Sequence, residues 1–556
     1  MQQIPASNDP DSVTAARWAA ALGRPEARPG VAGLAAIAVF GIALVVYLRT
    51  LLPGVSVGDW AEMQWIPAQL GIPHPTGYPL YVLLGKAFSL LPFGSLAFRA
   101  ELLSAVAAAA AAGTAVLIAA RLGVRPVIAL AAGLALAFSG ELWLEATYSE
   151  MNGLHLLLMA AVIHRAVVWR AERRDRDLQI GALLAGLSIS NHLLALTVVP
   201  IVILFVLIDA RSRLRERPVL LAQAAGLVIV GLTPYLFLPI RGLFGPAAIY
   251  GKFLTWQGVS SLVTGADLRS QMHFTSADNL VKTWNDVPAV LAQFRDRSNL
   301  VFVVGGLIGA GIQAVRDRWL FAMLGLIVVI NIFFFATYVG DLDHYLLVTW
   351  LAFAIWLAIA LETIVAWIER HVANAAIARG AAVLVVGLPL AILGANWATY
   401  DESQNHVGEE FAESVLAALP RDAVLLTYWD ALTNLGYVHC VDRQRPDVAF
   451  RSFDVTARVV CDPVEGTLED VARERPLFAL FAASSELDAV RGSFDLVPGP
   501  VLDVPYGKRG LDHAATLYRL IPRASGALGG LPSPPDQAGS ARISAAARWT
   551  ARTIGW

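Results

Sequence analysis

The sequence predicts a polytopic α-helical membrane protein with a small α/β region towards its C-terminal end. Apolar residues make up 56% of the 556 residues, charged residues only 15%, and the mean hydropathy is +0.58. Soluble domains carry about 25% charged residues, so much of this chain's surface needs an apolar solvent such as lipid. Long apolar runs recur up to about Trp397, and charges return after Tyr400. The membrane part therefore precedes the water-soluble part.

The first apolar run, Val31–Leu52, is expected to be a retained membrane helix rather than a cleaved signal. Roughly thirty polar and mixed residues precede it, and no small-residue cleavage site follows it. Arg17, Arg24 and Arg28 lie before the run, which favours a cytoplasmic position for an N-terminal tail over residues 1–30.

Further spans are expected near 100–120, 126–143, 151–169, 219–240, 298–315, 319–338, 346–367 and 380–397. The stretch Leu178–Ile208 is too long for one span, and Asn191 and His192 lie near its middle. Arginines flank it on both sides, so we expect two short spans with Asn191 and His192 at an outward tip. This gives about eleven crossings and places the C-terminal region outside. One long tilted helix would instead place that region in the cytoplasm.

These crossings divide the chain into a membrane domain over 31–398, with a first outward loop at 53–99, and an extracytoplasmic region over 399–522. In the latter, short apolar runs alternate with amphipathic helical stretches, which is typical of a small α/β domain. The runs are Ala423–Thr427, Val448–Phe453 and Leu477–Ala482. Residues 523–556, rich in Gly, Pro, Ser and Ala, are expected to form a flexible tail.

The two cysteines, Cys440 and Cys461, both fall in the C-terminal region. Two cysteines alone do not make a zinc site, so the alternatives are one disulfide or two free thiols. A disulfide is permitted on the outer side of the membrane, and both alternatives stay open at this point.

The first outward loop holds the densest group of unusual residues. Asp59 and Glu62 are three residues apart, so both carboxylates face one way on a helical turn. The segment Leu70–Tyr81, LGIPHPTGYPLY, contains prolines and glycines that forbid a regular helix and fix a turn-rich path. Two acids beside a rigid turn at the membrane surface favour a functional site. The alternative is a helix cap with a first-turn acid.

These two motifs resemble a family of multi-pass membrane proteins that was long catalogued as a membrane domain of unknown function. The family includes bacterial members and a vertebrate protein O-mannosyltransferase, and it is placed among GT-C-type glycosyltransferases. Further similar segments are Arg99–Ser104, Ala146–Glu150, Gly186–His192, Leu238–Arg241 and Gly340–Tyr345. The chain departs from the family at Ala61, where glycine is usual, and the 242–297 loop matches only through Trp256–Gly258 and Val263–Gly265.

The resemblance implies a GT-C-like bundle that transfers a sugar, such as mannose, from a polyprenyl-phosphate-linked donor to a hydroxyl at the outer face. The acceptor would be a protein, a glycolipid or a polysaccharide. An inverting transfer needs a carboxylate base and groups that stabilise the leaving phosphate. We assign Asp59 as the base, Glu62 as its partner or an alternative base, and Arg241 as the main phosphate clamp. The location implied is a bacterial inner membrane.

The other expected substrate-binding residues lie in or beside the outward loops: His74, Tyr78, Glu150, Asn191, His192, Asp341, Asp343 and His344. Three of the candidates have structural alternatives: Arg241 could mark a span end, His74 could cap a turn, and His192 could satisfy backbone groups in the hairpin. The closely spaced Asp341, Asp343 and His344 could hold a divalent cation. The resemblance requires no cofactor, and the metal assignment stays open.

Other classes of function fit the sequence less well. The net charge of -2 argues neither for nor against a nucleic-acid partner, but the sequence has no basic tail or arginine-rich module, which removes that class. A transporter or lipid-carrier flippase with a sensory outer domain is the main alternative, but the sequence shows no inverted repeat with matching broken helices. An envelope scaffold would leave the Asp59 loop without a purpose.

Overall fold

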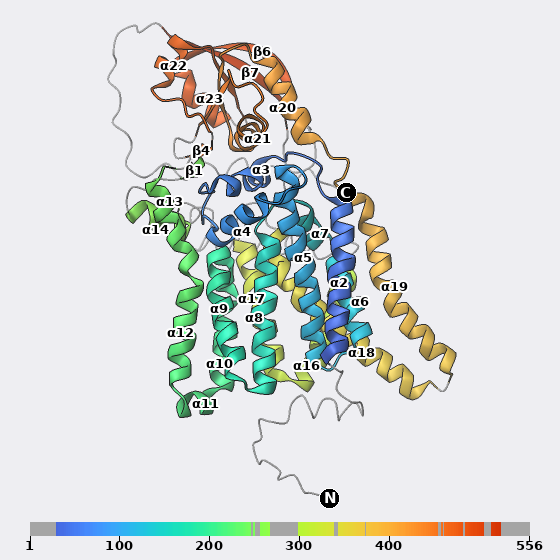
Figure 1. Cartoon of the computed structure of the whole chain (residues 1–556). Coiled ribbons are helices and arrows are strands. Elements are labelled where there is room, and N and C mark those ends of the chain that lie inside the picture. The colour runs from blue at the N-terminus through green and yellow to red at the C-terminus, as the bar shows by residue number, and fades with distance from the viewer. Residues whose placement is uncertain are drawn as a thin grey trace, which may run out of the picture.

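The computed structural model describes residues 29–245, 248–250, 256–266, 299–337, 343–372, 374–453, 457–459, 461–481, 484–504 and 513–523. A bundle of helices forms one part of the molecule, and a mixed β-sheet with its own helices lies at one end of this bundle (Figure 1). The short helices α3 (Gly58–Trp65) and α4 (Pro79–Ser89) of the first loop lie at the same end.

By length and composition, six helical stretches of the described chain can cross a membrane, and a bent pair makes a seventh. The six are Gly30–Thr50 in α2 (Pro29–Thr50), α5 (Leu96–Arg121), α8 (Asn152–Glu172), Val219–Leu243 across α12 (Val219–Gly231) and α13 (Phe237–Leu243), most of α17 (Arg318–Thr337), and α18 (Leu347–His371). Shorter apolar stretches are Leu193–Asp209, Leu300–Arg316 in α16 (Asn299–Arg316) and Val385–Tyr400 in α19 (Ala375–Tyr400). The predicted membrane class is confirmed, with fewer long spans than the expected eleven crossings.

The span expected over 126–143 is broken. Helices α6 (Pro126–Ala137) and α7 (Gly140–Thr147) meet at an angle of 63°. Carbonyl groups released by the break find donors on other helices: the Tyr47 hydroxyl bonds to the Ala137 oxygen at 2.6 Å and the Asn396 amide to the Phe138 oxygen at 2.8 Å. In an apolar medium such released groups must be satisfied inside the protein, so the bend depends on contacts from α2 and α19.

The predicted hairpin around Asn191 and His192 is present. Helix α9 (Asp175–Asn191) ends at His192, and a short 3₁₀ helix (Leu193–Thr197) leads into α10 (Val199–Asp209). Asp175 pairs with Arg213 at 2.7 Å and Asp209 pairs with Arg173 at 2.8 Å. The start of α9 and the end of α10 therefore lie at the same face of the bundle. The tip lies at the other face, near the first loop.

Helices α9 and α12 approach each other through glycine. A Cβ atom built on Gly186 would lie 2.2 Å from the Val228 oxygen and 2.9 Å from the Gly231 Cα. Small residues are common where membrane helices pack backbone to backbone. Side chains larger than glycine have no room at this crossing.

A five-stranded sheet forms the core of the C-terminal region. Its strand order is β3-β2-β5-β7-β6, with β2 parallel to β3 and β5, and β7 antiparallel to β5 and β6. The strands are β2 (Val424–Thr427), β3 (Ala449–Ser452), β5 (Leu477–Leu480), β6 (Phe494–Val504) and β7 (His513–Pro522). The helices of this region are α20 (Val407–Ala418), α21 (Trp429–Cys440), α22 (Leu468–Glu474) and α23 (Ser484–Arg491). Each predicted apolar run contains a strand, which confirms the α/β character, whereas β6 and β7 were not anticipated.

A disulfide joins Cys440 at the end of α21 to Cys461. It resolves the two alternatives that the sequence left open. Near it, β4 (Ala457–Val459) pairs with β1 (Ala248–Tyr250), which belongs to the loop after α13.

The C-terminal region and the first loop share one hydrophobic core. Val55, Trp65 and Ile66 of the first loop pack in the same cluster as Leu432 and Leu435 of α21. All five side chains are buried. The sheet region is therefore packed firmly on the first loop.

Candidate functional site

Helix α3 presents the two predicted acids to different surroundings. Gly58, with φ at +61°, starts the helix in a conformation that a side chain disfavours. Asp59 in the first turn keeps 48% of its side chain exposed, whereas Glu62 one turn later is fully buried. The Asp59 carboxylate can therefore meet a substrate, while Glu62 faces the protein interior.

Glu62 holds the turn that contains His74. One Glu62 carboxylate oxygen accepts the backbone N–H of His74 at 2.8 Å, and the other is in short contact with His74 Nδ1. The Tyr78 hydroxyl lies 3.1 Å from His74 Nε2 and donates to the Pro75 oxygen at 2.9 Å. The proline-rich turn is thus tied to α3 through a buried carboxylate.

The electrostatics of this pair favour the protonated forms. Burial alone lowers the pKa of His74, but the Asp59, Glu62 and Glu150 carboxylates outweigh it and raise the pKa to about 10. Burial raises the pKa of Glu62, although His74 opposes this effect. Because the pKa values of Glu62 and His74 are both raised, the pair holds at least one proton at neutral pH. With Glu62 ionised, His74 is an imidazolium 3.8 Å from the Asp59 carboxylate.

The C-terminal region completes the surroundings of Asp59. The indole N–H of Trp429, the first residue of α21, donates to Asp59 Oδ1 at 2.6 Å. Asp430 lies against Gly58, with Oδ1 2.8 Å from the position of a Cβ built on that glycine. Burial, and then repulsion by Asp59, raise the pKa of Asp430 to about 6.

The hairpin tip lies beside this cluster. The His192 ring is 5.3 Å from the ring of Tyr78 and 5.6 Å from that of His155, measured between centroids. His192 Nδ1 accepts the Leu194 backbone N–H at 3.0 Å, and Asn191 donates to the Met151 oxygen at 3.2 Å. His192 therefore borders the cluster, while Asn191 fixes the tip to α8.

Glu150 is buried at the start of α8. It contributes to the field at both His74 and Tyr78. The Asn152 amide donates to Glu145 at 3.0 Å and reaches Glu150 at 3.5 Å. Glu150 thus adds negative charge behind the His74 turn.

Arg241 contacts the first loop from α13. Its guanidinium donates to the Leu70 oxygen at 2.8 Å and to the Gln69 oxygen at 3.3 Å. In this arrangement Arg241 holds the turn that precedes His74, and its expected phosphate contact stays a prediction.

The remaining predicted residues are Asp341, Asp343 and His344. Asp341 lies outside the described residues, as do the side chains of Asp343 and His344. A cation could instead be held by Asp59, Glu62 and His74, because one ligand atom from each lies within 4.8 Å of the others. A second such group, His439, Cys461 and Asp462, includes a cysteine that is already in the disulfide.

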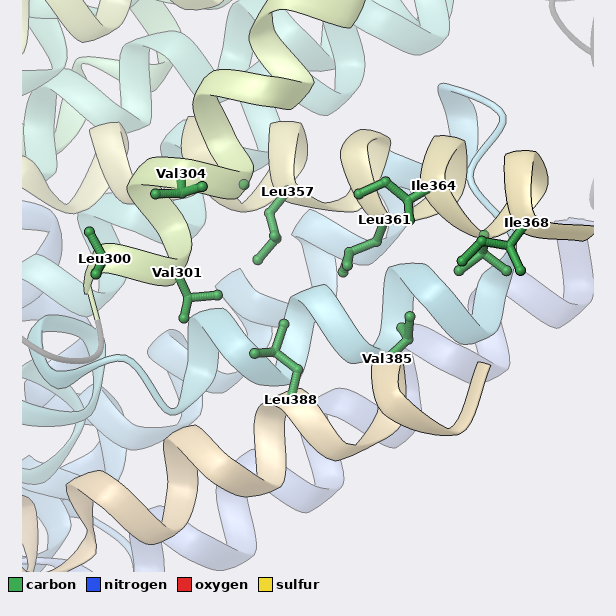
Figure 2. Close-up of a pocket in the computed structure, with 11 residues that line it drawn as sticks. Leu300, Val301, Val304, Leu357, Leu361, Ile364, Ile368, Val385 and Leu388 are labelled. Carbon is green, nitrogen blue, oxygen red and sulfur yellow. The ribbon is translucent and has the colours of Figure 1, made fainter. Parts of the chain in front are cut away.

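An apolar groove lies apart from these residues, between α16, α18 and α19 (Figure 2). Its volume is 540 Å³, and every lining residue is apolar, among them Leu300, Leu357 and Leu388. Without a titratable or hydrogen-bonding side chain in its lining, this groove offers no group for acid–base chemistry.

Sequence reasoning missed Trp429, Asp430 and His155. A signal for the first two existed, because Tyr428, Trp429 and Asp430 directly follow the predicted strand Ala423–Thr427. Ligand sites of α/β sheets often lie beyond the carboxyl ends of parallel strands. Nothing local in the sequence links these residues to Asp59.

Residues 59–215 match the family described as the N-terminal domain of protein O-mannosyl-transferase TMEM260. The chain is 29% identical to Protein O-mannosyl-transferase TMEM260 of Mus musculus over 445 residues, which cover 74% of this chain and 62% of that protein. It is 22% identical to the tmem260 protein of Dictyostelium discoideum over 461 residues, covering 74% and 56%. The chain therefore spans about three fifths of the length of these relatives.

The structure is similar to the crystal structure of ArnT from Cupriavidus metallidurans in the apo state. The TM-score is 0.55 at 13% identity, and the match covers 87% of this chain and 97% of ArnT. The structure of the same protein bound to undecaprenyl phosphate matches with a TM-score of 0.52 over the same shares. The expected GT-C-like fold is confirmed, as is the resemblance to protein O-mannosyl-transferases. The segment of this chain that matches the family begins at Asp59.

Proposed function

We propose that this chain is a membrane glycosyltransferase that moves a sugar, mannose in our expectation, from a polyprenyl-phosphate-linked donor to a hydroxyl acceptor. The observation that carries the proposal is the half-exposed Asp59 carboxylate on a rigid loop, where the apolar bundle meets the sheet region. A lipid-linked donor keeps its chain in the bilayer and its sugar-phosphate at the interface. A catalytic carboxylate at this rim suits such a donor.

In the proposed reaction, Asp59 takes the proton of the acceptor hydroxyl. The acceptor oxygen attacks the anomeric carbon of the sugar while the bond from that carbon to the phosphate oxygen breaks. The lipid phosphate leaves with the electron pair of that bond, and the attack from the opposite side inverts the anomeric configuration. Asp59 later returns the proton to solvent.

Glu62 has a supporting role in this proposal. Its buried carboxylate is occupied by the backbone and the ring of His74, so it holds the loop rather than acting as the base. In this proposal the His74 imidazolium, 3.8 Å from the Asp59 carboxylate, helps to stabilise the leaving phosphate. Tyr78 and His192 border the same space and are proposed to contact the sugar-phosphate.

We propose that the reaction needs no resident cation, because the buried Glu62 carboxylate is already engaged by the backbone N–H and the ring of His74. The expected outcome is that dialysis against EDTA leaves the transfer rate of the purified protein unchanged. A rate that falls on dialysis and returns with added Mn²⁺ or Mg²⁺ would instead assign Asp59, Glu62 and His74 as a cation site.

The printed names of the relatives favour a protein acceptor for this chain. The curated relatives are named protein O-mannosyl-transferases, and ArnT has been crystallised with undecaprenyl phosphate. We therefore propose a polyprenyl-phosphate carrier and protein hydroxyls, with glycolipid or polysaccharide acceptors as the alternatives. Mass spectrometry of envelope glycopeptides and glycans, with and without the protein, distinguishes them.

For the topology, we propose about eleven crossings of a bacterial inner membrane, with the N-terminus in the cytoplasm. The short stretches in α16 and α19, the α9–α10 hairpin and the bent α6–α7 pair would supply the crossings beyond the six long helices. The Cys440–Cys461 disulfide supports an outer position for the C-terminal region, since disulfides persist in oxidising compartments.

The central test is Asp59→Asn, which removes the base while keeping the side chain's shape. We expect sugar transfer to fall by about 100-fold or more, because a general base contributes about 10²–10⁴-fold to rate. The assay follows tritiated mannose from mannosyl polyprenyl phosphate into acid-precipitated envelope protein. Asp503→Asn, at an exposed carboxylate on β6, is the matched control. Wild-type transfer by a correctly inserted Asp59→Asn protein would disprove the mechanism.

A further inference from the structure

We infer that Trp429 is a positioning residue for the proposed transfer. Its indole N–H holds the Asp59 carboxylate in the orientation in which it accepts the acceptor's proton, so the catalytic site is incomplete without the C-terminal region. This inference rests on the proposed function, because it assigns Asp59 as the base.

The geometry of Asp59 supports this role. Trp429 Nε1 donates to Asp59 Oδ1 at 2.6 Å, and His74 Nδ1 lies 3.8 Å from the same oxygen. Both of these contacts use Oδ1, so Oδ2 is the oxygen directed to the acceptor hydroxyl. An aspartate that is 48% exposed would otherwise sample several rotamers, and a base in the wrong rotamer is ineffective.

Trp429 can act as a fixed donor because α21 is firmly attached to the first loop. The Asn434 amide donates to the Ser56 oxygen at 2.6 Å, and the Trp65 indole donates to the Thr433 oxygen at 3.3 Å. These bonds involve two adjacent residues of α21, about one turn after Trp429, beside the shared hydrophobic core. The distance from Trp429 to Asp59 is therefore set by a packed interface and not by one hydrogen bond.

The indole ring is itself held on two sides. It makes edge-to-face contacts with Tyr250 at 5.7 Å and with His74 at 6.4 Å between ring centroids. Such contacts orient the ring plane and hence the direction of the N–H. Tyr250 belongs to β1, and its backbone N–H donates to the Ile72 oxygen at 3.0 Å. Strand β1 is therefore attached to the first loop and supports the position of the indole ring.

Two substitutions of Trp429 test the hydrogen-bond donor and the aromatic ring independently. Trp429→Phe keeps an aromatic ring and removes the N–H. Trp429→Gln removes the ring but places an amide nitrogen the same number of bonds from Cβ as the indole nitrogen. If donation to Asp59 is the function, kcat of the phenylalanine variant falls by about 10- to 100-fold with the KM for the donor unchanged. The glutamine variant then keeps a higher kcat than the phenylalanine variant.

The control is Tyr437→Phe, which removes another hydrogen bond of the same interface. The Tyr437 hydroxyl accepts the Ala97 backbone N–H at 3.1 Å and does not touch Asp59. We expect this variant to keep the wild-type kcat. All proteins are used as purified full chains in nanodiscs with mannosyl polyprenyl phosphate and envelope protein, and thermal unfolding shows that they are folded.

The outcomes distinguish this inference from the proposed function. A glutamine variant that is no better than the phenylalanine variant, or a wild-type kcat in Trp429→Phe, overturns the positioning role while Asp59→Asn remains inactive. Transfer by Asp59→Asn at the wild-type rate overturns the proposed function itself. The order wild type, glutamine, phenylalanine in kcat, together with an inactive Asp59→Asn, supports both.

Discussion

Two carboxylates one helical turn apart take different roles because their surroundings differ. Asp59 is half-exposed and held by an indole N–H, whereas Glu62 is buried against the His74 backbone and ring. Enzymes commonly divide acid–base roles between carboxylates in this way. Spacing alone predicts that both face one side of a helix, but only the packed structure decides which of them meets solvent.

The His74 pair gives a pH dependence of stability. The pKa of His74 is about 10 in the folded chain against an ordinary value of 6.5, so the folded state binds the proton more tightly. This contribution is complete below about pH 6.5 and is lost as the pH rises towards 10. We expect the apparent Tm to fall between about pH 7 and 10, and to fall less in His74→Gln. Differential scanning fluorimetry in detergent measures it.

The control for this experiment is His406→Gln. His406 lies in the C-terminal region, directly before α20, and its side chain is 51% exposed, so we expect its substitution to leave the slope of Tm against pH as in the wild type. Equal slopes for His74→Gln and the wild type would show that the pair does not hold its proton as described.

At the scale of helices, close packing rests on a few glycines. Gly186 and Gly231 let α9 and α12 approach with their backbones in contact, and α9 carries the hairpin tip beside Tyr78. The position of His192 in the site thus depends on a helix crossing deeper in the bundle.

We expect Gly186→Ala to destabilise the protein by about 1–3 kcal/mol, because its methyl group would have to displace the α12 backbone. Gly226→Ala on α12 is the matched control, since nothing lies within 4 Å of its Cβ position. Alanine there should be neutral or stabilising by about 0.5–1 kcal/mol through helix propensity. Thermal unfolding of both variants measures the difference, and equal shifts would contradict tight packing at Gly186.

At the scale of the whole molecule, we expect the C-terminal region to lie on the outer side of the membrane. A periplasm-active phosphatase fused after Tyr400 should be active in a bacterial host, and a fluorescent cytoplasmic reporter at the same site should be inactive. In the full chain, Cys440 and Cys461 should resist alkylation until they are reduced. A fluorescent cytoplasmic reporter, with both thiols open to alkylation, would reverse the proposed topology.

Much of the architecture could be predicted because its causes are local. Apolar composition indicates lipid, flanking arginines indicate the α9–α10 hairpin, and the Asp59–Glu62 spacing with the His74 turn indicates a site. The break between α6 and α7 could not be predicted, since its donors, Tyr47 and Asn396, come from other helices.

Two further features escaped prediction for similar reasons. Strand β6 contains Pro498 and Pro500 around a glycine, and such residues argue against a strand unless the partner strand is known. Trp429 reaches Asp59 across 370 residues of chain, a contact fixed by the docking of one region on another. No local pattern in the sequence encodes that docking.

The distance along the chain between Asp59 and Trp429 has a consequence for biosynthesis. Asp59 is translated early, just after the first membrane helix, whereas Trp429 is translated only after the helices of the bundle that the structure describes. A nascent or prematurely terminated chain therefore contains the base without the residue that orients it. On our proposal, the enzyme gains full activity only after α21 has been synthesised and has packed on the first loop, which protects the lipid-linked sugar from shorter chains.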